Sequence, residues 1–277
     1  MPNRLLWALL AFFAAFNAGK PLLADTALGA LIPLISIAVP VIFVLVQGPR
    51  QIGWARLGLF FALTCVISWS FESVSIATGF PFGNYHYTDS LGPKLGTVPL
   101  LIMPAYFGVC YISWIIAGQL ADHNRPAPRA TLTLAIVASF VMVMWDLSMD
   151  PARATVHQAW IWHDGGAYFG VPFVNFAGWF LCVFTIFMAY GLLAPRLIAK
   201  NPAEAASTDG LPLGLYAGLF AEVLSFVVWP HDGSVTDAAG TVWVLRDIYQ
   251  SLALVSIFTM GFVIVLGLLK LSQTRPT

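Results

Sequence analysis

"FFALTCVISWSFESVSIATGFPFGNYHYTDSLGPKLGTVPLLIMP", residues 60–104, joins two contrasting kinds of sequence. The first part is an apolar run that ends near Thr78 and carries a single acid, Glu72. The second part, residues 78–104, is rich in Gly, Pro, Tyr, His and Asn, and its Gly and Pro residues break the helical pattern. Non-helical backbone is tolerated at membrane depth only where protein covers it or where it lines a cavity. The stretch therefore predicts a membrane helix followed by a segment that forms the lid and wall of a pocket.

The whole chain has the composition of an integral membrane protein. Of its 277 residues, 59% are hydrophobic and only 9% are charged, whereas roughly a quarter are charged in soluble domains. Crossing a bilayer takes about 20 apolar residues in a helix. Eight stretches reach or approach that length: 5–23, 27–47, 56–78, 99–121, 130–149, 172–194, 211–230 and 248–270. We expect an all-α, polytopic transmembrane helical bundle that forms a single membrane domain over residues 1–277.

The first stretch is the weakest of the eight. Asn17, Lys20 and Pro21 interrupt its apolar run, and a short or interfacial helix at this position would leave seven spans. It also lacks the small-residue cleavage site and polar mature region that follow a cleavable signal peptide.

The charges of the loops orient the predicted helices. With eight spans, one side holds nine cationic residues and the other holds four. The first group is Arg4, Arg50, Arg56, Arg125, Arg129, Arg196, Lys200, Lys270 and Arg275; the second is Lys20, Lys94, Arg153 and Arg246. Because cytoplasmic loops carry the excess of Lys and Arg, we expect a multi-pass protein of the cell membrane with both termini in the cytoplasm.

Three long connections fall on the non-cytoplasmic side: 79–98, 150–171 and 231–247. All three are aromatic and rich in Gly and Pro, whereas the cytoplasmic links are shorter on average. Because the three connections share this composition and lie on one side, we expect them to form re-entrant or lid loops around the mouth of a single pocket. The alternative is that they plug the bundle for stability alone.

Four acids lie inside predicted spans: Glu72, Asp146, Asp150 and Glu222. Asp146 and Asp150 are four residues apart and therefore share a helical face. An ionisable residue in a span is costly and is by default a functional candidate, with helix capping or a buried ion pair as the alternative. Apart from Arg56 at the very start of the 56–78 stretch, the spans that carry these acids contain no Lys or Arg. Burial therefore favours the neutral carboxylic acid, a form that can donate a proton.

We therefore predict catalytic roles for Glu72, Asp146 and Asp150. For Asp150, termination of the helix before Pro151 is an equal alternative. For Glu222, proton relay or hydrogen bonding competes with catalysis. Aromatic residues gather around these acids, and their faces can either stabilise a carbocation or anchor helices at the membrane interface. The candidate substrate- or water-binding residues are Phe82, Tyr85, Tyr87, Trp145, Trp160, Trp162, Asn175, Trp179, Glu222 and His231.

Several chemistries lack their motifs. The sequence has no GxGxxG, no GxxxxGK[ST] and no Asp-rich prenyltransferase pair, so a phosphate cradle is missing. We expect no cofactor and no metal, although His157, His163 and Asp164 form an alternative ligand set. The net charge of zero argues against a nucleic-acid partner. The scattered Cys65, Cys110 and Cys182 are expected to serve packing.

Three blocks of sequence carry a family resemblance. They are "FESVSIATGFPFGNYHYTDSLGPKLGTVPL" (71–100), "WDLSMDP" (145–151) and "WIWHDGGAYFGVPFVNFAGW" (160–179). Together and in this order they resemble the membrane family of carotenoid biosynthesis proteins, which includes carotenoid hydratases. The matching positions are Glu72, Gly79, Pro81, Phe82, Gly83, Tyr85, Tyr87, Asp146, Asp150, Pro151, Trp160, Trp162, Gly170, Pro172, Asn175 and Trp179. The resemblance is strong over about residues 66–180, so Glu222 and His231 rest on residue chemistry alone.

The resemblance implies a cofactor-independent hydro-lyase that adds water to the terminal double bond of an acyclic ψ end group. In the mechanism that we expect, neutral Glu72 or Asp146 protonates the alkene and aromatic faces stabilise the tertiary cation. Water held by Asp150, with help from Tyr85, Tyr87 or Asn175, then captures the cation. The expected partners are the lipid bilayer and an acyclic carotenoid, lycopene-like or longer.

The sequence leaves two other functions open. A carotenoid cyclase begins with the same protonation, and an internal alkene then captures the cation. A proton-coupled transporter of a lipophilic substrate would use Glu72, Asp146 and Glu222 as a relay. The sequence does not indicate an oligomeric state.

Overall fold

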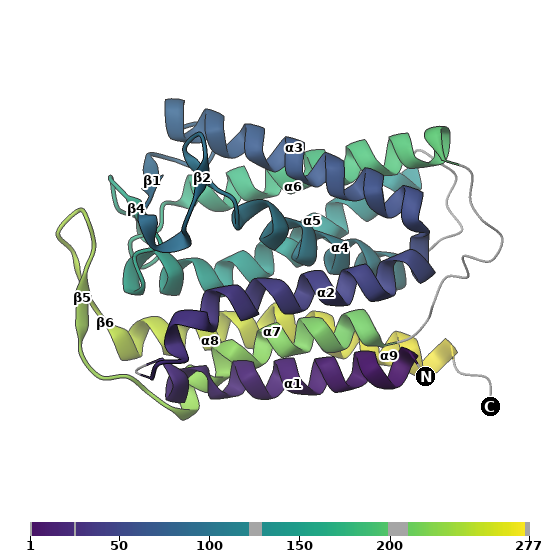
Figure 1. Cartoon of the computed structure of the whole chain (residues 1–277). Coiled ribbons are helices and arrows are strands. Elements are labelled where there is room, and N and C mark those ends of the chain that lie inside the picture. Colours follow the sequence, from purple (N-terminus) through teal and green to yellow (C-terminus); the bar gives the residue numbers. More distant parts are fainter. Residues whose placement is uncertain (1, 25, 122–128, 199–209, 275–277) are drawn as a thin grey trace.

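Long helices, roughly parallel to one another, account for most of the chain (Figure 1). The computed structural model describes residues 2–24, 26–121, 129–198 and 210–274. Within these ranges there are nine α-helices: α1 Pro2–Leu23, α2 Ile32–Ile52, α3 Trp54–Thr78, α4 Ile102–Leu120, α5 Arg129–Pro151, α6 Phe173–Leu197, α7 Leu211–Val228, α8 Leu245–Phe258 and α9 Met260–Thr274. Eight helical segments of the described chain are long and apolar enough to cross a membrane, the last of them formed by α8 and α9 together. The predicted all-α polytopic bundle is confirmed.

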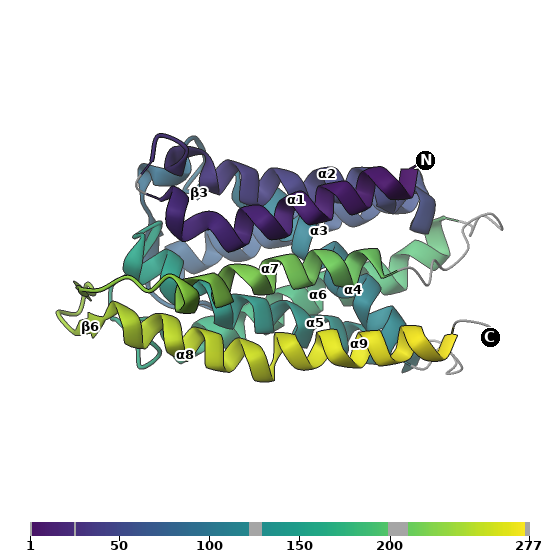
Figure 2. The same ribbon diagram turned by 90° about the horizontal axis from the view of Figure 1, so that it is seen from below.

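The first predicted span is a full helix, long and apolar enough to cross a membrane. The polar residues that weaken its apolar pattern face α7, which lies beside α1 (Figure 2). The Asn17 side-chain amide donates to the Gly218 carbonyl at 2.9 Å, and the Lys20 ammonium contacts the Glu222 carboxylate at 2.6 Å. Both side chains are buried, so each turns a polar group toward a partner on α7 rather than toward lipid.

Some helices depart from their predicted ends. A 3₁₀ turn, Gly29–Leu31, precedes α2, which continues to Ile52. At the end of α5, the chain adds a π-helical turn, Ala152–Val156. The last span is broken at Thr259, where α8 ends and α9 begins. The end of α3 agrees with the prediction, because Gly79 takes up a left-handed conformation (φ 78°) that stops the helix.

The strands of the described chain all lie at one end of the bundle, opposite the two termini (Figure 1). Strand β1 (Tyr85–Tyr87) pairs antiparallel with β4 (Trp160–Trp162), so that Tyr85 faces Trp162 and Tyr87 faces Trp160 across the ladder. Two hairpins accompany this pair: β2 (Lys94–Leu95) with β3 (Val98–Pro99), and β5 (Ser234–Thr236) with β6 (Val242–Val244). The pairing of β1 with β4 ties together the first two of the three long connections.

The third connection packs against the second. The ring centroids of Phe169 and Trp243 lie 5.4 Å apart, and the Trp243 indole donates to Asp237 at 2.8 Å. The predicted meeting of the three connections at one end of the bundle is therefore observed.

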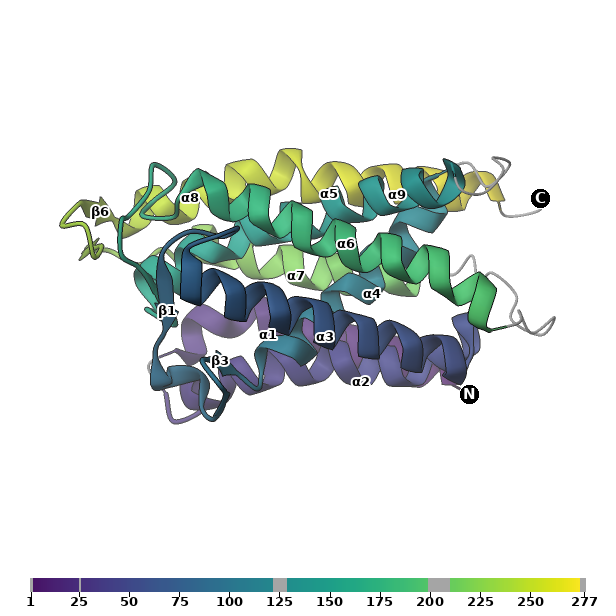
Figure 3. The same ribbon diagram turned by 90° about the horizontal axis from the view of Figure 1, so that it is seen from above.

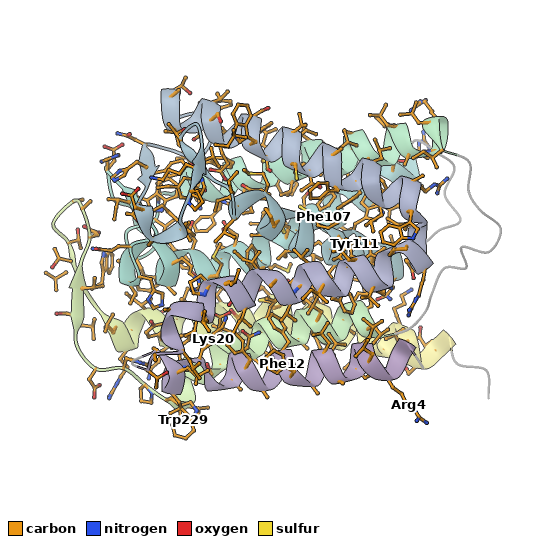
Figure 4. All side chains as sticks on the ribbon, in the orientation of Figure 1. Arg4, Phe12, Lys20, Phe107, Tyr111 and Trp229 are labelled. Carbon is orange, nitrogen blue, oxygen red and sulfur yellow. The ribbon has the colours of Figure 1, made fainter. Side chains whose placement is uncertain are left out.

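The helices bury a continuous apolar core and leave many large apolar side chains on their outer faces. Phe107 and Tyr111, labelled in Figure 4, belong to this core. Phe258 and Leu5 are examples of the outer residues, with 74% and 65% of their surface exposed. An apolar outer face of this kind suits contact with lipid. Figure 3 shows that α6 lies beside α3, an arrangement that places the start of α6 next to the 79–83 turn.

Candidate active site

A cavity of about 520 Å³ occupies the strand end of the bundle. Twelve of the thirteen candidate residues lie in its wall: Glu72, Phe82, Tyr85, Tyr87, Trp145, Asp150, Trp160, Trp162, Asn175, Trp179, Glu222 and His231. These residues come from helices α3, α5, α6 and α7 and from all three long connections. The tertiary structure thus gathers residues that are up to 159 positions apart in the sequence (Glu72 to His231) around one space.

The Glu72 carboxyl group is buried and accepts three tyrosine hydrogen bonds. Tyr85 and Tyr87 both donate to its Oε2, the latter at 2.9 Å, and Tyr106 donates to its Oε1 at 2.8 Å. Residues alternate across a strand, so the buried Tyr85 and Tyr87 point inward from β1, whereas His86 points outward and stacks on His163. Glu72 is thereby fixed at the wall of the cavity by hydroxyl groups from two elements.

The tyrosines around Glu72 remain hydrogen-bond donors at physiological pH. Burial, and then the nearby Glu72 carboxylate, hold the pKa of both Tyr85 and Tyr87 well above the ordinary value. The predicted set includes these two tyrosines but not Tyr106, which lies in the first turns of α4. The signal in the sequence is a phenol hydroxyl inside an apolar span that also holds Tyr111, and that pattern does not reveal the partner of Tyr106 on α3.

Asp146 and Asp150 share one amide. The Asn175 side-chain nitrogen donates to Asp150 Oδ2 and lies 3.4 Å from Asp146 Oδ2. Asp150 Oδ1 accepts a second bond, 2.9 Å long, from the Trp160 indole. Asp146 Oδ1 has no hydrogen-bond partner among the described residues. Both acids are buried, and the helical spacing brings them to the same side of α5 as predicted.

Asp146 is the one candidate residue that, in the described structure, does not reach the cavity wall. Its Oδ2 lies 3.4 Å from the side-chain nitrogen of Asn175, which does line the cavity. Within the described residues, Glu72, Asp146 and Asp150 form no ion pair with Lys, Arg or His.

Glu222 differs, and the expectation that it lacks a cationic neighbour is wrong. Its Oε2 lies 2.6 Å from the Lys20 ammonium and its Oε1 lies 2.9 Å from the Arg153 guanidinium. The partners come from α1 and from the turn after α5, so a search of Glu222's own helix could not find them. Figure 4 shows Lys20 toward the strand end of the bundle, whereas Arg4 lies at the far end and points outward.

This ion group also corrects the count of loop charges. The span pattern assigns Lys20 and Arg153 to the non-cytoplasmic loops, but they contact Glu222 inside the bundle, which leaves Lys94 and Arg246 as cations of the loops at that end. On the opposite side, Arg125, Lys200 and Arg275 lie outside the described residues. The charge bias keeps its predicted direction.

Aromatic rings pack around the acids. Tyr106 and Trp179 are stacked with centroids 4.4 Å apart, and Trp145 meets Trp179 edge to face at 6.3 Å. Tyr85 lies 4.7 Å from Trp162. Such interlocked rings have few alternative rotamers and present fixed π faces to the cavity.

The alternative ligand set of His157, His163 and Asp164 is not assembled. Within the part of the chain that the structure describes, no three His, Cys, Asp or Glu side chains are grouped as a metal site would require. The three cysteines belong to the packed helices, with Cys110 and Cys182 buried and Cys65 half-buried.

Comparison with known proteins gives two matches. The family model described as "Carotenoid biosynthesis protein" matches residues 27–245. Bisanhydrobacterioruberin hydratase of Haloarcula japonica is 32% identical over 127 residues, which make up 46% of this chain and 42% of that protein. The similarity to this relative therefore spans less than half of its length. No solved structure matches the chain.

Proposed function

Because the chain belongs to the carotenoid biosynthesis protein family, we propose that it is a hydratase that adds water to the terminal C=C bond of an acyclic carotenoid. The observation that carries this proposal is the cavity wall, in which carboxyl groups without cationic partners among the described residues line the same space as aromatic rings. The partial similarity to bisanhydrobacterioruberin hydratase supports the same reaction class. Protonation of an alkene needs an acid, a surface for the cation and a water molecule.

We assign the proton donor to Asp150 rather than to Glu72 or Asp146. Two carboxyl groups that share one site do not readily ionise together, and one proton stays with the pair. Asp146 and Asp150 share the Asn175 amide, and only Asp150 of the two lines the cavity. Its proton forms the new C–H bond at the CH carbon of the (CH₃)₂C=CH– end, which leaves a tertiary cation.

Glu72 and the aromatic rings stabilise that cation. Three O–H donors converge on the Glu72 carboxyl group and hold both of its oxygens at the cavity wall, where they can face a positive charge. The faces of Trp145, Trp162 and Trp179 add the attraction between a cation and a π system, which is worth up to about 2 kcal/mol where water is excluded. Positive charge that develops next to these groups lowers the barrier because they are already oriented.

Capture of the cation by water completes the reaction. Its oxygen bonds to the tertiary carbon, and one of its protons passes to the Asp150 carboxylate, which restores the acid. The balance is one alkene and one water to one tertiary alcohol, with neither oxidation nor reduction.

The proposal is tested by incubating the purified protein in detergent with lycopene. We expect a product that is heavier than the substrate by one water. A cyclised isomer of unchanged mass would instead identify a cyclase, and unchanged lycopene would contradict both enzymes. The transporter alternative is weakened by Glu222, since an acid held between two cations is a poor member of a proton relay.

Two variants test the assignment of roles. Asp150→Asn removes the general acid, and Glu72→Gln removes an oriented group that stabilises the cation. Each is expected to slow alcohol formation at least about 100-fold, the lower end of the range for either loss. Asp164→Asn, which alters an exposed acid of the 150–171 connection, is the matched control and should keep the parent rate. Full activity in both Asp150→Asn and Glu72→Gln would contradict the assignment.

A further inference from the structure

The same cavity has a second polar region that the mechanism above does not use. We call it the polar pole: Lys20, Arg153, His157, Glu222, His231 and Tyr249, all of which line the cavity. It carries the charges of two cations and one carboxylate. The residues come from α1, from the turn after α5, from α7 and α8, and from the connection between them.

The polar pole has more hydrogen-bond donors than the protein satisfies. The Lys20 side chain is 3% exposed, and its ammonium, with three N–H donors, contacts one Glu222 oxygen. The Arg153 guanidinium has five donors and, among the described residues, donates to the other Glu222 oxygen only. The Nδ1 atom of His231 is buried and also has no partner in the described structure. Buried polar groups of this kind are normally satisfied by ordered water.

A small second cavity provides room for such a water. Its volume is about 20 Å³, and Arg153, His157, Glu222 and Tyr249 belong to its wall as well as to the wall of the large cavity. One water needs about 10–15 Å³ and two to four polar partners. The volume therefore fits a single water, and the four residues named above supply donors and acceptors.

His157 can accept a hydrogen bond from this water. Its ring is accessible on the wall of the cavity, yet the enclosing protein, and then the Arg153 charge, lower its pKa to about 4. The imidazole is therefore neutral at physiological pH and keeps one nitrogen as an acceptor.

The polar pole adjoins the predicted proton donor. Trp145, Met149, Asp150 and Arg153 all line the large cavity from the end of α5 and the turn that follows it. Arg153 comes three residues after Asp150, on the π-helical turn. Arg153 and Asp150 thus lie about one helical turn apart in the backbone, and both line the cavity that a water would cross.

We propose that the polar pole is a water-binding site that supplies the nucleophile for hydration. This inference rests on the proposed function and adds the source of the water to it. Water moves from the Arg153–Glu222 site to the tertiary cation, its oxygen forms the C–O bond, and the released proton goes to the Asp150 carboxylate. When water is not delivered, the cation loses a proton from an adjacent carbon and the alkene is restored.

Incubation in D₂O distinguishes capture of the cation by water from return of the cation to the alkene. In D₂O, the acid delivers a deuteron to the alkene, so every cation that returns to alkene can carry deuterium into the recovered substrate. The parent protein should form mostly alcohol. The double variant Lys20→Met with Glu222→Gln, which removes one charge of each sign and keeps the side-chain sizes similar, should form alcohol at least tenfold more slowly while deuterium still enters the recovered alkene.

A second variant tests the small cavity without changing charge. Val223 lines it from α7, and Val223→Leu fills space that the water would occupy, so the same loss of alcohol with retained exchange is expected. The matched control for the double variant is Arg246→Met with Asp232→Asn, which removes an exposed ion pair and should behave as the parent does.

The outcomes distinguish the two proposals. A parent that forms no alcohol overturns the proposed function itself. If the parent forms alcohol, only the water site can be overturned. That is the result if alcohol formation and deuterium exchange fall together in the variants, or if neither of them changes. If the double variant does not fold, as judged by its melting temperature in detergent, Val223→Leu decides by the same ratio of alcohol to exchanged alkene.

Discussion

Glu72 and Glu222 are both acids on the inner side of membrane helices, but their surroundings differ in kind. Three tyrosine hydroxyls surround Glu72, whereas Lys20 and Arg153 hold Glu222. Hydroxyl groups leave a carboxylate with its negative charge uncompensated, so Glu72 can still respond to a positive charge in the cavity. Glu222 is already compensated by two cations, so we expect it to hold other polar groups in place.

Tyr106→Phe tests the contribution of one hydroxyl to Glu72. A hydrogen bond to a charged group is worth about 1.5–3 kcal/mol, and each 1.4 kcal/mol is about a tenfold change. We therefore expect alcohol formation from lycopene to slow roughly 10- to 100-fold, with little change in the ring packing against Trp179.

Tyr216→Phe is the matched control, since Tyr216 is also a buried phenol but donates to the Val141 carbonyl away from the cavity wall. It should keep the parent rate even if it lowers the melting temperature. Equal rates for Tyr106→Phe and the parent would show that this hydroxyl is not needed by Glu72.

At the scale of elements, the site depends on the close approach of α6 to the turn between α3 and β1. Gly178 of α6 lies against that turn, and a Cβ at this position would come within 2.7 Å of the Pro81 carbonyl oxygen and 2.8 Å of the Phe82 ring. Phe82 lines the cavity and lies next to Tyr85. The position of β1 therefore depends on the absence of a side chain at Gly178. Two of the hydroxyl donors to Glu72 come from β1 and depend on it as well.

Gly178→Ala is expected to push the 79–83 turn away from α6. Overpacking of this kind costs about 1–3 kcal/mol, so the melting temperature should fall and alcohol formation should slow because Tyr85 and Tyr87 shift from Glu72. Both quantities are measured on the same purified protein.

Gly58→Ala makes the same chemical change on α3, where a Cβ would meet nothing within 4 Å. Alanine is favoured over glycine inside a helix by roughly 0.5–1 kcal/mol, so this control should match or exceed the stability of the parent. A Gly178→Ala protein as stable and active as Gly58→Ala would contradict the packing argument.

Across the whole molecule, the two ends of the bundle have different chemistry. The strand end carries the cavity, the hairpins and the exposed acids Asp89, Asp164 and Asp232. The opposite end carries the start of α1, the end of α9 and, among the described residues, the cations Arg4, Arg50, Arg56, Arg129, Arg196 and Lys270 (Figure 1). The positive-inside rule therefore still predicts that the cavity opens toward the non-cytoplasmic side.

Labelling of single cysteines tests this orientation. Ala239→Cys lies on the β5–β6 hairpin and Arg4→Cys lies near the N-terminus, and both positions are exposed. In intact cells, we expect a membrane-impermeant maleimide to label Ala239→Cys and not Arg4→Cys, which should react only after the cells are permeabilised. The reverse pattern would place the cavity on the cytoplasmic side.

The sequence by itself determined the spans, the identity of the acids and the end of the molecule at which the site is built. These features depend on local patterns: apolar runs set the helices, four-residue spacing put Asp146 and Asp150 on one side of α5, and Gly and Pro marked the long connections. Twelve of the thirteen candidate residues consequently lie around one cavity.

Only the tertiary structure decided which groups meet across helices. It added Tyr106 to Glu72, paired Glu222 with Lys20 and Arg153, and kept Asp146 out of the cavity wall. Such contacts depend on how each helix is rotated and shifted against its neighbours. Hydropathy cannot set that rotation in a chain whose helices are apolar on most faces, so packing at positions such as Gly178 and buried polar contacts such as Lys20 with Glu222 set it instead.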